Sequence, residues 1–415
     1  MHAIVLNTGT ELLLGDVQDA HLAFIARQIF PLGLRIEERR TVSDSVAIRE
    51  TLAEIFPRAE ILFVTGGLGP TTDDITREAA AELLGLKLIR DPEVMSAILE
   101  RFATRGIQFT ARVERQAFVP AGAEVLPNRS GTAPGLYLRA NLNPHFRSPH
   151  LFLLPGPPRE LQPIFERSVM PILHSIVPPS NSLECRIYRI TGIGELLVEE
   201  AIGERISAIS GVELGYCSRP GDVDVRIIGK SNMLEQADKI IRATLGDSIY
   251  SMNEATLEEV IAELLTKRRE TLSLAESCTG GLLANRITNV PGASRVLLGG
   301  YVVYSNQAKM DALDVDLKLI ERYGAVSEPV GRALAEGARM RARSTYALST
   351  TGIAGPGGGS SEKPVGTVYV ALASPENEII AKKLFFPSDR ETFKELAAQA
   401  AFDLLRKKLM SRSSQ

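Results

Sequence analysis

The chain has 415 residues, of which 44% are hydrophobic and 23% charged, and it contains no tryptophan. At roughly 150 residues per domain, this length predicts about three domains. A formal net charge of -3 and a pI near 6.1 exclude the strongly basic surface that binds nucleic-acid backbones, so no nucleic-acid partner is expected. Three widely spaced cysteines and the lack of a membrane-length apolar run predict a cytoplasmic protein with no membrane partner.

Residues 1–174 alternate predicted strands and helices. The apolar stretches AIVLN, ILFVTGG and HLFLLPG predict strands, and TGTELLLGD predicts a loop. Apolar positions at three- and four-residue spacing predict amphipathic helices in DAHLAFIARQIFPLGL, IRETLAEIF and DDITREAAAELLG, the last of them ended by Gly85. This alternation predicts an α/β domain whose mainly parallel sheet has helices on both faces.

The stretch VPPSNS (177–182) predicts a linker, and residues 182–250 predict a small α+β domain with no recognisable catalytic constellation. A capping box of Thr256 and Glu259 then predicts the start of a helix. Strands expected in TLSLA, VLLGGYVVY, YALSTTG and GTVYVALA make residues 254–415 a second three-layer α/β domain. The final MSRSSQ is expected to be frayed.

The stretch LAESCTGG (274–281) predicts a nucleophile, Ser277, where a strand gives way to a helix beginning near Thr279. Free backbone N–H groups at such a helix start favour an anion or a developing oxyanion, and Gly280 and Gly281 allow a ligand to approach closely. A second glycine-rich loop, TGIAGPGGGS (351–360), also follows a strand.

All five histidines lie in the first domain, which excludes a Ser-His-Asp triad within the last one. The remaining base is a lysine with a depressed pKa, and YVVYSNQAKM offers Lys309, with Tyr304 to relay or hold the proton. Three alternatives stay open: Ser277 is only an N-cap, Lys309 is a solvated surface lysine, or Cys278 is the nucleophile.

The first domain carries acids after its predicted strands and around the glycines of TGGLGP. The acids are Glu11, Asp16, Asp44, Asp73 and Asp74, and the glycines are Gly66, Gly67 and Gly69. Carboxylates gathered beside glycine N–H groups suit a divalent metal that bridges a pyrophosphate. The competing interpretation places Asp73 and Asp74 in a first helical turn, where acids stabilise the helix dipole without any ligand.

The motifs together resemble one protein family. AESCTGG, YSNQAK, YGAVSEPV and TGIAGPGGGSSEKPVGTVYVA are similar to the C-terminal domain of the CinA family, which is related to nicotinamide mononucleotide deamidases. GTELLLGD, TGGLGPTTDDITREA and LPGPPREL resemble the family's N-terminal domain, related to molybdopterin-binding proteins of the MoaB/MogA type. The middle unit occupies the place of its KH-like domain.

The resemblance implies hydrolysis of the carboxamide of nicotinamide mononucleotide to nicotinic acid mononucleotide and ammonia, without a cofactor. It makes Ser277 the nucleophile and Tyr304 and Lys309 its activating partners. Residues expected to bind the substrate are Cys278, Thr279, Gly280, Gly281, Ser294, Thr351, Gly352, Gly355 and Arg390. Arg390 would meet the phosphate, although this chain has Ser388 where the family usually has glycine.

For the first domain, the resemblance implies cleavage of ADP-ribose at its pyrophosphate with a divalent metal, held by Asp44 and Asp74. A homodimer is expected. Two other classes compete: a protein that binds a nucleotide or pterin without chemistry, and an interaction protein of DNA uptake or repair. The second class finds little support in the middle domain, where TGIGELLVEE supplies no GXXG loop and is followed by acids.

Overall fold

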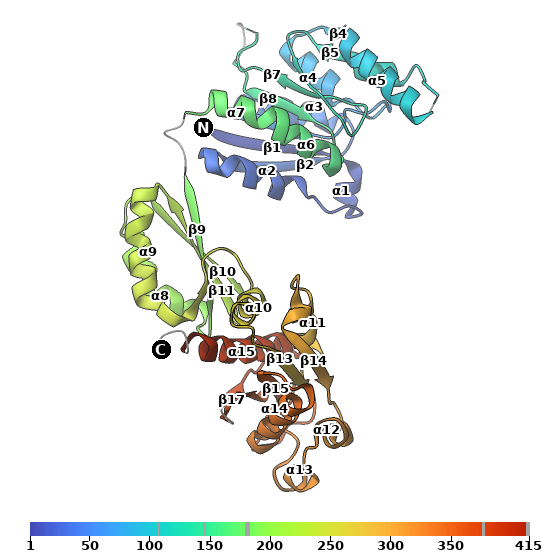
Figure 1. The fold of residues 1–415 in the computed structure, drawn as a ribbon. Coiled ribbons are helices and arrows are strands. Elements are labelled where there is room, and N and C mark those ends of the chain that lie inside the picture. Colours follow the sequence, from blue (N-terminus) through green and yellow to red (C-terminus); the bar gives the residue numbers. More distant parts are fainter. Residues whose placement is uncertain (107, 144–146, 179–182, 376–377, 412–415) are drawn as a thin grey trace. The chain divides into compact units, whose positions relative to one another are not determined.

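A computed structural model describes the chain except for residues 107, 144–146, 179–182, 376–377 and 412–415. The chain divides into two compact units, Met1–Leu183 and Glu184–Gln415 (Figure 1). Most of the predicted linker VPPSNS and the last four residues of MSRSSQ lie outside the described residues.

The N-terminal unit is built on a six-stranded sheet with the order β2-β1-β3-β8-β7-β6. Its strands are β1 (His2–Thr8), β2 (Arg35–Val42), β3 (Ile61–Thr65), β6 (Glu124–Leu126), β7 (Gly135–Leu138) and β8 (His150–Leu154), with β4 (Leu88–Arg90) and β5 (Phe118–Pro120) forming a separate pair. The first four strands of that order are parallel, and β7 alone runs against its neighbours. Four parallel strands bring their carboxyl ends to one edge, which is where the predicted acids and glycines lie.

Helices cover both faces of this sheet (Figure 1). They are α1 (Thr10–Leu14), α2 (His21–Ile29), α3 (Ala47–Ile55), α4 (Thr76–Leu84), α5 (Pro92–Arg105), α6 (Pro158–Ile164) and α7 (Met170–Ile176), with short helical turns η1 (Phe30–Leu32), η2 (Val113–Ala117) and η3 (Phe165–Val169). Alternate residues of β1 enter two cores: Ile4 and Leu6 pack with α3 and α4, and Ala3 and Val5 pack with α2, α6 and α7. All of β3 is buried between the two cores, and its residues before Thr65 are therefore all apolar.

The end of α4 was predicted correctly, whereas the short helix α1 was not predicted. Gly85 ends α4 in the left-handed conformation, as predicted. The stretch TGTELLLGD was predicted to be a loop, which is wrong for Thr10–Leu14, because these residues form the short helix α1.

The second unit begins with the KH-like domain. Its strands are β9 (Glu184–Thr191), β10 (Val212–Arg219), β11 (Asp222–Gly229) and β12 (Ile249–Ser251), its helices are α8 (Glu195–Ser207) and α9 (Ser231–Leu245), and η5 (Gly246–Ser248) precedes β12. The sheet has the order β10-β11-β9-β12 and is antiparallel throughout. One face of it packs on both helices through a single apolar core.

The rest of this unit is the second three-layer α/β domain. Its five-stranded sheet has the order β14-β13-β15-β16-β17, with β13 (Leu272–Glu276), β14 (Leu297–Val302), β15 (Tyr346–Gly352), β16 (Thr367–Ala373) and β17 (Ile379–Phe385). Only β16 runs opposite to the others. The strand β17, at an edge, was not predicted, because IIAKKLF is neither continuously apolar nor strictly alternating.

Helices again lie on both faces. They are α10 (Leu257–Arg268), α11 (Leu282–Thr288), α12 (Asn306–Leu313), α13 (Leu317–Tyr323), α14 (Glu328–Ala342) and α15 (Arg390–Ser411), with the turn η6 (Ala293–Arg295). The helices α10, α11 and α15 pack on large side chains of the sheet, and α12 to α14 pack on its small alanines. The predicted capping box of Thr256 and Glu259 is confirmed. Fraying of MSRSSQ is wrong for Met410 and Ser411, which belong to α15.

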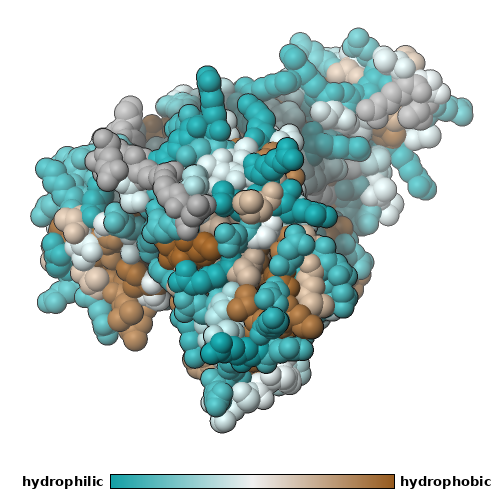
Figure 2. Space-filling model, turned by 60° about the horizontal axis from the view of Figure 1, so that its bottom comes forward, coloured by the Kyte–Doolittle hydropathy of each residue, from teal (hydrophilic) through white to brown (hydrophobic). Residues whose placement is uncertain are grey.

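On the face that Figure 2 presents, hydrophobic side chains form separate patches within a largely hydrophilic surface. Across the described residues, no helix combines the length and the apolar character that crossing a bilayer requires.

Candidate active site

Ser277 lies directly after β13, at the carboxyl end of the parallel strands. Its backbone N–H donates to Thr350 O of the neighbouring strand β15 at 3.0 Å. The side chain is half-buried, whereas Gly280, three residues on, is exposed, and a Cβ atom there would meet nothing within 4 Å. The predicted position of the nucleophile at a sheet edge with an open glycine loop is therefore what the structure shows.

The residue before Ser277 organises this loop and was not among the predicted site residues. Glu276 is 1% exposed, and its carboxylate accepts from the N–H groups of Gly281, Leu283 and Ala284 at 2.8–3.1 Å. It also accepts from the Thr279 hydroxyl at 2.8 Å. The sequence signal was a carboxylate as the last residue of a buried strand.

Glu276 corrects two sequence-based expectations. The helix α11 begins at Leu282 rather than near Thr279, and its N-cap is Gly281, so Ser277 is not an N-cap. Because Glu276 already occupies the N–H groups at the start of α11, that helix end is not free to bind a substrate anion.

We expect Glu276→Gln to reduce stability and activity together. The amide NH₂ of glutamine would face backbone N–H donors, which leaves buried donors without acceptors at a cost of about 1–3 kcal/mol. Thermal unfolding and the rate of amide hydrolysis would measure both effects. Glu258→Gln, on α10 of the same domain, is the control for loss of a partly buried carboxylate, and equal losses of activity in the two variants would contradict a specific role of Glu276.

Lys309 lies in the first turn of α12, which follows the carboxyl end of β14. The side chain is 1% exposed, and its Nζ lies 3.2 Å from Ser277 Oγ. The same nitrogen donates to the carbonyl of Val303 at 2.8 Å and to that of Tyr304 at 3.2 Å. Burial lowers the pKa of Lys309, against a smaller opposing effect of Cys278. A solvated surface lysine is therefore excluded.

Both protonation forms of the amine fit these contacts. As an ammonium, Nζ donates to Ser277 Oγ and to the carbonyls of Val303 and Tyr304, with Ser305 O a further acceptor at 3.5 Å. As a neutral amine, it donates to the two nearer carbonyls, and its lone pair can accept the proton of the Ser277 hydroxyl. The distance between Nζ and Oγ therefore permits proton transfer from the serine to the neutral lysine.

Cys278 is the alternative nucleophile, and its environment disfavours it. The side chain is 5% exposed and belongs to the core below the sheet. Burial raises the pKa of Cys278 to about 12, so the residue is a thiol at neutral pH rather than the reactive thiolate.

Tyr304 and Arg390 meet at the exposed side of the loop. Arg390 donates to the Tyr304 hydroxyl and to Gly355 O, each at 2.9 Å. The Tyr304 side chain is 63% exposed, and its hydroxyl contacts Arg390 instead of Lys309. The expected proton relay through the Tyr304 hydroxyl is therefore not the arrangement found, since only the backbone carbonyl of Tyr304 reaches Lys309.

The remaining predicted residues of this site have mostly structural contacts. Thr279 is fully buried and bonded to Thr350 at 2.7 Å, and Thr351 donates to Ala325 O at 2.8 Å, so neither hydroxyl is free for a ligand. A Cβ at Gly352 would lie 2.8 Å from Thr367 O, which explains the glycine by close packing.

Ser294 does not join this group. It lies in η6, before β14, and therefore at the amino ends of the parallel strands β13 and β14. Ser277 follows the carboxyl end of β13, so the two serines occupy opposite edges of the sheet. Within one chain the assignment of Ser294 to the Ser277 pocket is wrong, because the parallel register separates them by the length of a strand.

The N-terminal unit gathers its predicted residues in one cavity of about 320 Å³. The predicted residues that line it are Glu11, Asp44, Gly66, Gly67, Gly69, Asp73 and Asp74. They follow β1, β2 and β3, whose carboxyl ends meet at this edge. Asp16 is the predicted acid that is absent from the described lining.

Asp73 and Asp74 do not lie in a helix. The helix α4 begins at Thr76, and the Asp74 carboxylate accepts from the N–H and the hydroxyl of Thr71. The helix-dipole interpretation of these acids is therefore wrong. Thr8 and Gln116 also line this cavity, and their Oγ1 and Oε1 atoms are buried and have no hydrogen-bond partner among the described residues.

The predicted metal site depends on which carboxylates of this cavity come together. In the described part of the chain no three His, Cys, Asp or Glu side chains converge as a metal cluster. Asp44 and Asp74 nevertheless face one cavity as hard oxygen donors. Two carboxylates fit an ion such as Mg²⁺ that takes its other ligands from water and a substrate phosphate.

The fold and the two sites define a three-domain α/β protein with a ligand cavity in one end domain and a serine-lysine pair in the other. The family model for a probable molybdopterin binding domain matches residues 4–175, that for the CinA KH domain matches 185–251, and that for the CinA C-terminal domain matches 254–409. A CinA-like protein from Akkermansia muciniphila is 42% identical over 96% of this chain and 95% of its own length.

A CinA-like protein from Dictyoglomus thermophilum is 38% identical over 99% of this chain and all of its own length. Among solved structures, the competence/damage inducible protein CihA from Agrobacterium tumefaciens is 35% identical, with 37% of this chain and 96% of that chain covered and a TM-score of 0.36. The chain belongs to the CinA family.

Proposed function

We propose that the C-terminal domain hydrolyses the carboxamide of nicotinamide mononucleotide. The observation that carries this proposal is the buried contact of Lys309 Nζ with Ser277 Oγ at 3.2 Å. A lysine with a lowered pKa, in contact with a serine at an open glycine loop, supports nucleophilic attack on an acyl carbon.

In the proposed reaction, Lys309 takes the proton of Ser277 as Oγ bonds to the amide carbon. The C–N bond then breaks, and Lys309 returns the proton to the departing nitrogen, so that ammonia leaves. Water attacks the acyl-serine ester with Lys309 again as the base, which releases nicotinic acid mononucleotide and restores the Ser277 hydroxyl.

Two further groups have proposed roles in binding. Because Glu276 takes the N–H groups of Gly281, Leu283 and Ala284, the backbone amides of residues 278–280 are the candidates for stabilising the oxyanion. The exposed guanidinium of Arg390, held by Tyr304 and Gly355, would meet the substrate phosphate.

A substrate panel on the purified protein tests this function. Nicotinamide mononucleotide should release ammonia and nicotinic acid mononucleotide in equal amounts, and free nicotinamide, which lacks the phosphate, should react far more slowly. If none of the nucleotide amides releases ammonia, the proposed function is wrong.

We also propose that the N-terminal cavity cleaves ADP-ribose at its pyrophosphate. The gathering of its acids and glycines in one cavity at the carboxyl ends of parallel strands supports a polar ligand there. A divalent ion, which would neutralise phosphate charge when bound, is proposed to be held by Asp44 and Asp74. The glycines leave room for the phosphates and supply N–H donors.

Asp74→Asn should lower AMP release from ADP-ribose at least about tenfold, because it removes one of the two proposed anionic metal ligands. Ammonia release from nicotinamide mononucleotide should not change, since that site lies in the other unit. Asp16→Asn is the matched control, an acid of the same domain outside the described cavity lining. AMP release that survives in Asp74→Asn, or that never depends on added metal, would contradict this assignment.

A further inference from the structure

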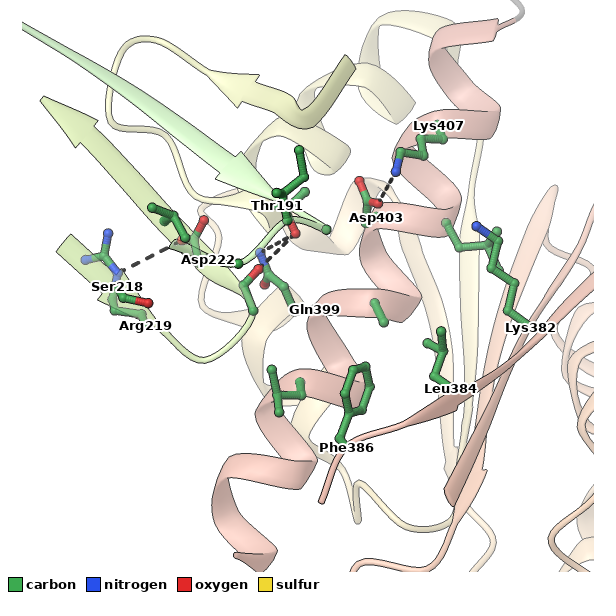
Figure 3. Close-up of a pocket in the computed structure, with 18 residues that line it drawn as sticks. Thr191, Ser218, Arg219, Asp222, Lys382, Leu384, Phe386, Gln399, Asp403 and Lys407 are labelled. Carbon is green, nitrogen blue, oxygen red and sulfur yellow. Dashed lines mark hydrogen bonds and ion pairs between the residues drawn. The ribbon is translucent and has the colours of Figure 1, made fainter. Parts of the chain in front are cut away.

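Unit Glu184–Gln415 also contains a cavity of about 450 Å³ whose lining includes none of the residues of the two sites described above. Figure 3 shows it between the KH-like domain and the C-terminal α/β domain. One wall is the segment 191–194 with the β10–β11 turn, and the other is β17 with one face of α15. Its size is that of cavities that hold small organic ligands.

The lining is largely apolar on both walls. Apolar side chains from the two domains that face it are Ile193, Val223, Leu384, Phe386, Leu396 and Leu404. The Gln399 side chain, which is 4% exposed, already has hydrogen-bond partners: its amide NH₂ donates weakly to Thr191 at 3.5 Å, and its carbonyl oxygen accepts from Arg286 at 2.7 Å. A ligand would therefore bury its apolar surface against these side chains and would not need to supply hydrogen bonds to Gln399.

One end of the cavity carries an excess of positive charge. Asp403 is shared by two cations, the fully buried Arg406 at 2.7 Å and Lys407 at 2.7 Å. Lys382 lies at the same end in Figure 3 and has no ion-pair partner among the described residues. Among the residues that line this end, two lysines and one carboxylate leave about one positive charge, and the buried Arg406 behind them shares the Asp403 carboxylate.

The opposite end is closer to neutral. Arg219 and Asp222 line it, and Arg219 is paired with Asp224. Gly192 borders the positive end, since a Cβ there would lie in ordinary contact, at 3.7 Å, with both Asp403 Oδ2 and Lys407 Nζ. Apolar walls and a cationic end are complementary to an amphipathic anion.

We propose that this cavity is a binding site for a small amphipathic anion, with its apolar body against Leu384, Phe386 and Leu396 and its acidic group beside Lys382 and Lys407. The site does not depend on the proposed hydrolytic activities. The probe for it is 8-anilinonaphthalene-1-sulfonate, and N-phenyl-1-naphthylamine is the matched probe that lacks the sulfonate.

The strand β17 provides the matched control variant. Lys382, Leu384 and Phe386 alternate along the chain and line the cavity, so Lys383 points to the other face. Lys382→Glu should weaken binding of the sulfonate probe about tenfold or more and leave the neutral probe nearly unchanged. Lys383→Glu should affect neither, and the filling variant Ala400→Trp should weaken both.

Fluorescence titration of the full chain measures these affinities, thermal unfolding checks each variant's fold, and light scattering gives its mass. Equal effects of Lys382→Glu and Lys383→Glu would overturn the proposal, because they would report general surface charge. A change of mass in Lys382→Glu or Ala400→Trp without a change in probe binding would also overturn it, because a second copy of the chain would then be the occupant. Lys382 is exposed, so its variant remains informative even if Ala400→Trp fails to fold.

Discussion

Ser277→Ala is expected to abolish ammonia release from nicotinamide mononucleotide, with a loss on the order of 10⁴-fold or more, since no acyl-enzyme can form without the hydroxyl. The fold should survive. Ser277 is half-buried, and the substitution removes one side-chain hydrogen bond, worth about 1 kcal/mol. Steady-state ammonia assays and thermal unfolding of the same preparation would separate the two effects.

Cys278→Ala is the control for this experiment. The thiol is buried, with its pKa raised to about 12, so its removal should leave hydrolysis within a few-fold of the parent rate while lowering stability modestly through lost packing. If Cys278→Ala were inactive and Ser277→Ala active, the nucleophile would be Cys278, and the contact with Lys309 would have to be structural.

If Lys309 is the base of the proposed amide hydrolysis, the rate should fall on the acid side of the pH profile. Only the neutral amine accepts the Ser277 proton, and burial places its pKa below 10.5, the ordinary value for lysine. The rate constant kcat/KM should therefore rise with pH through the lowered Lys309 pKa and level off above it, and on the acid side it should fall about tenfold per pH unit. The measurement is kcat/KM for nicotinamide mononucleotide across the pH range in which the protein stays folded.

Two substitutions test whether the lysine is the base. Lys309→Met keeps an unbranched apolar stem but has no proton acceptor, and a loss of about 10²–10⁴-fold is expected. Lys309→Arg keeps hydrogen-bond donors at this position, but its guanidinium stays protonated and cannot accept a proton, so this variant should be equally inactive. Full activity in Lys309→Arg, or a profile that is flat on the acid side in the parent protein, would contradict the role of Lys309 as a base.

Most of the fold follows from local patterns. The largely apolar stretch of β3 predicts a buried strand of a covered sheet, and β1 places alternate residues in two cores, as the predicted layers require. The edge strand β17 cannot be predicted in this way. Several of its side chains are exposed, so they need not be apolar, and the strand lacks the apolar pattern of a buried one.

For the candidate sites too, some residues could be predicted from the sequence and others could not. The order of predicted strands and helices places Ser277 and the glycines of TGGLGP after strands, and parallel strands bring such positions together. The strand β2, which precedes Asp44, was not predicted, so only the structure brings Asp44 to the same edge. The assignment of Ser294 came from the family resemblance, and the structure places this residue before β14, at the opposite edge of the sheet from Ser277. Sequence reasoning also missed Glu276, whose four partners come from residues that only the turn of the loop brings back to it.

The sequence by itself determined which chemical groups are available: a serine without a histidine in the last domain, a lysine and a tyrosine within six residues, and acids beside glycines in the first domain. Only the tertiary structure decided that Lys309 reaches Ser277 while the Tyr304 hydroxyl turns to Arg390. The physical reason is that a pKa and a proton-transfer contact depend on burial and on distances of about 3 Å between segments far apart in the chain, and spacing along the sequence fixes neither.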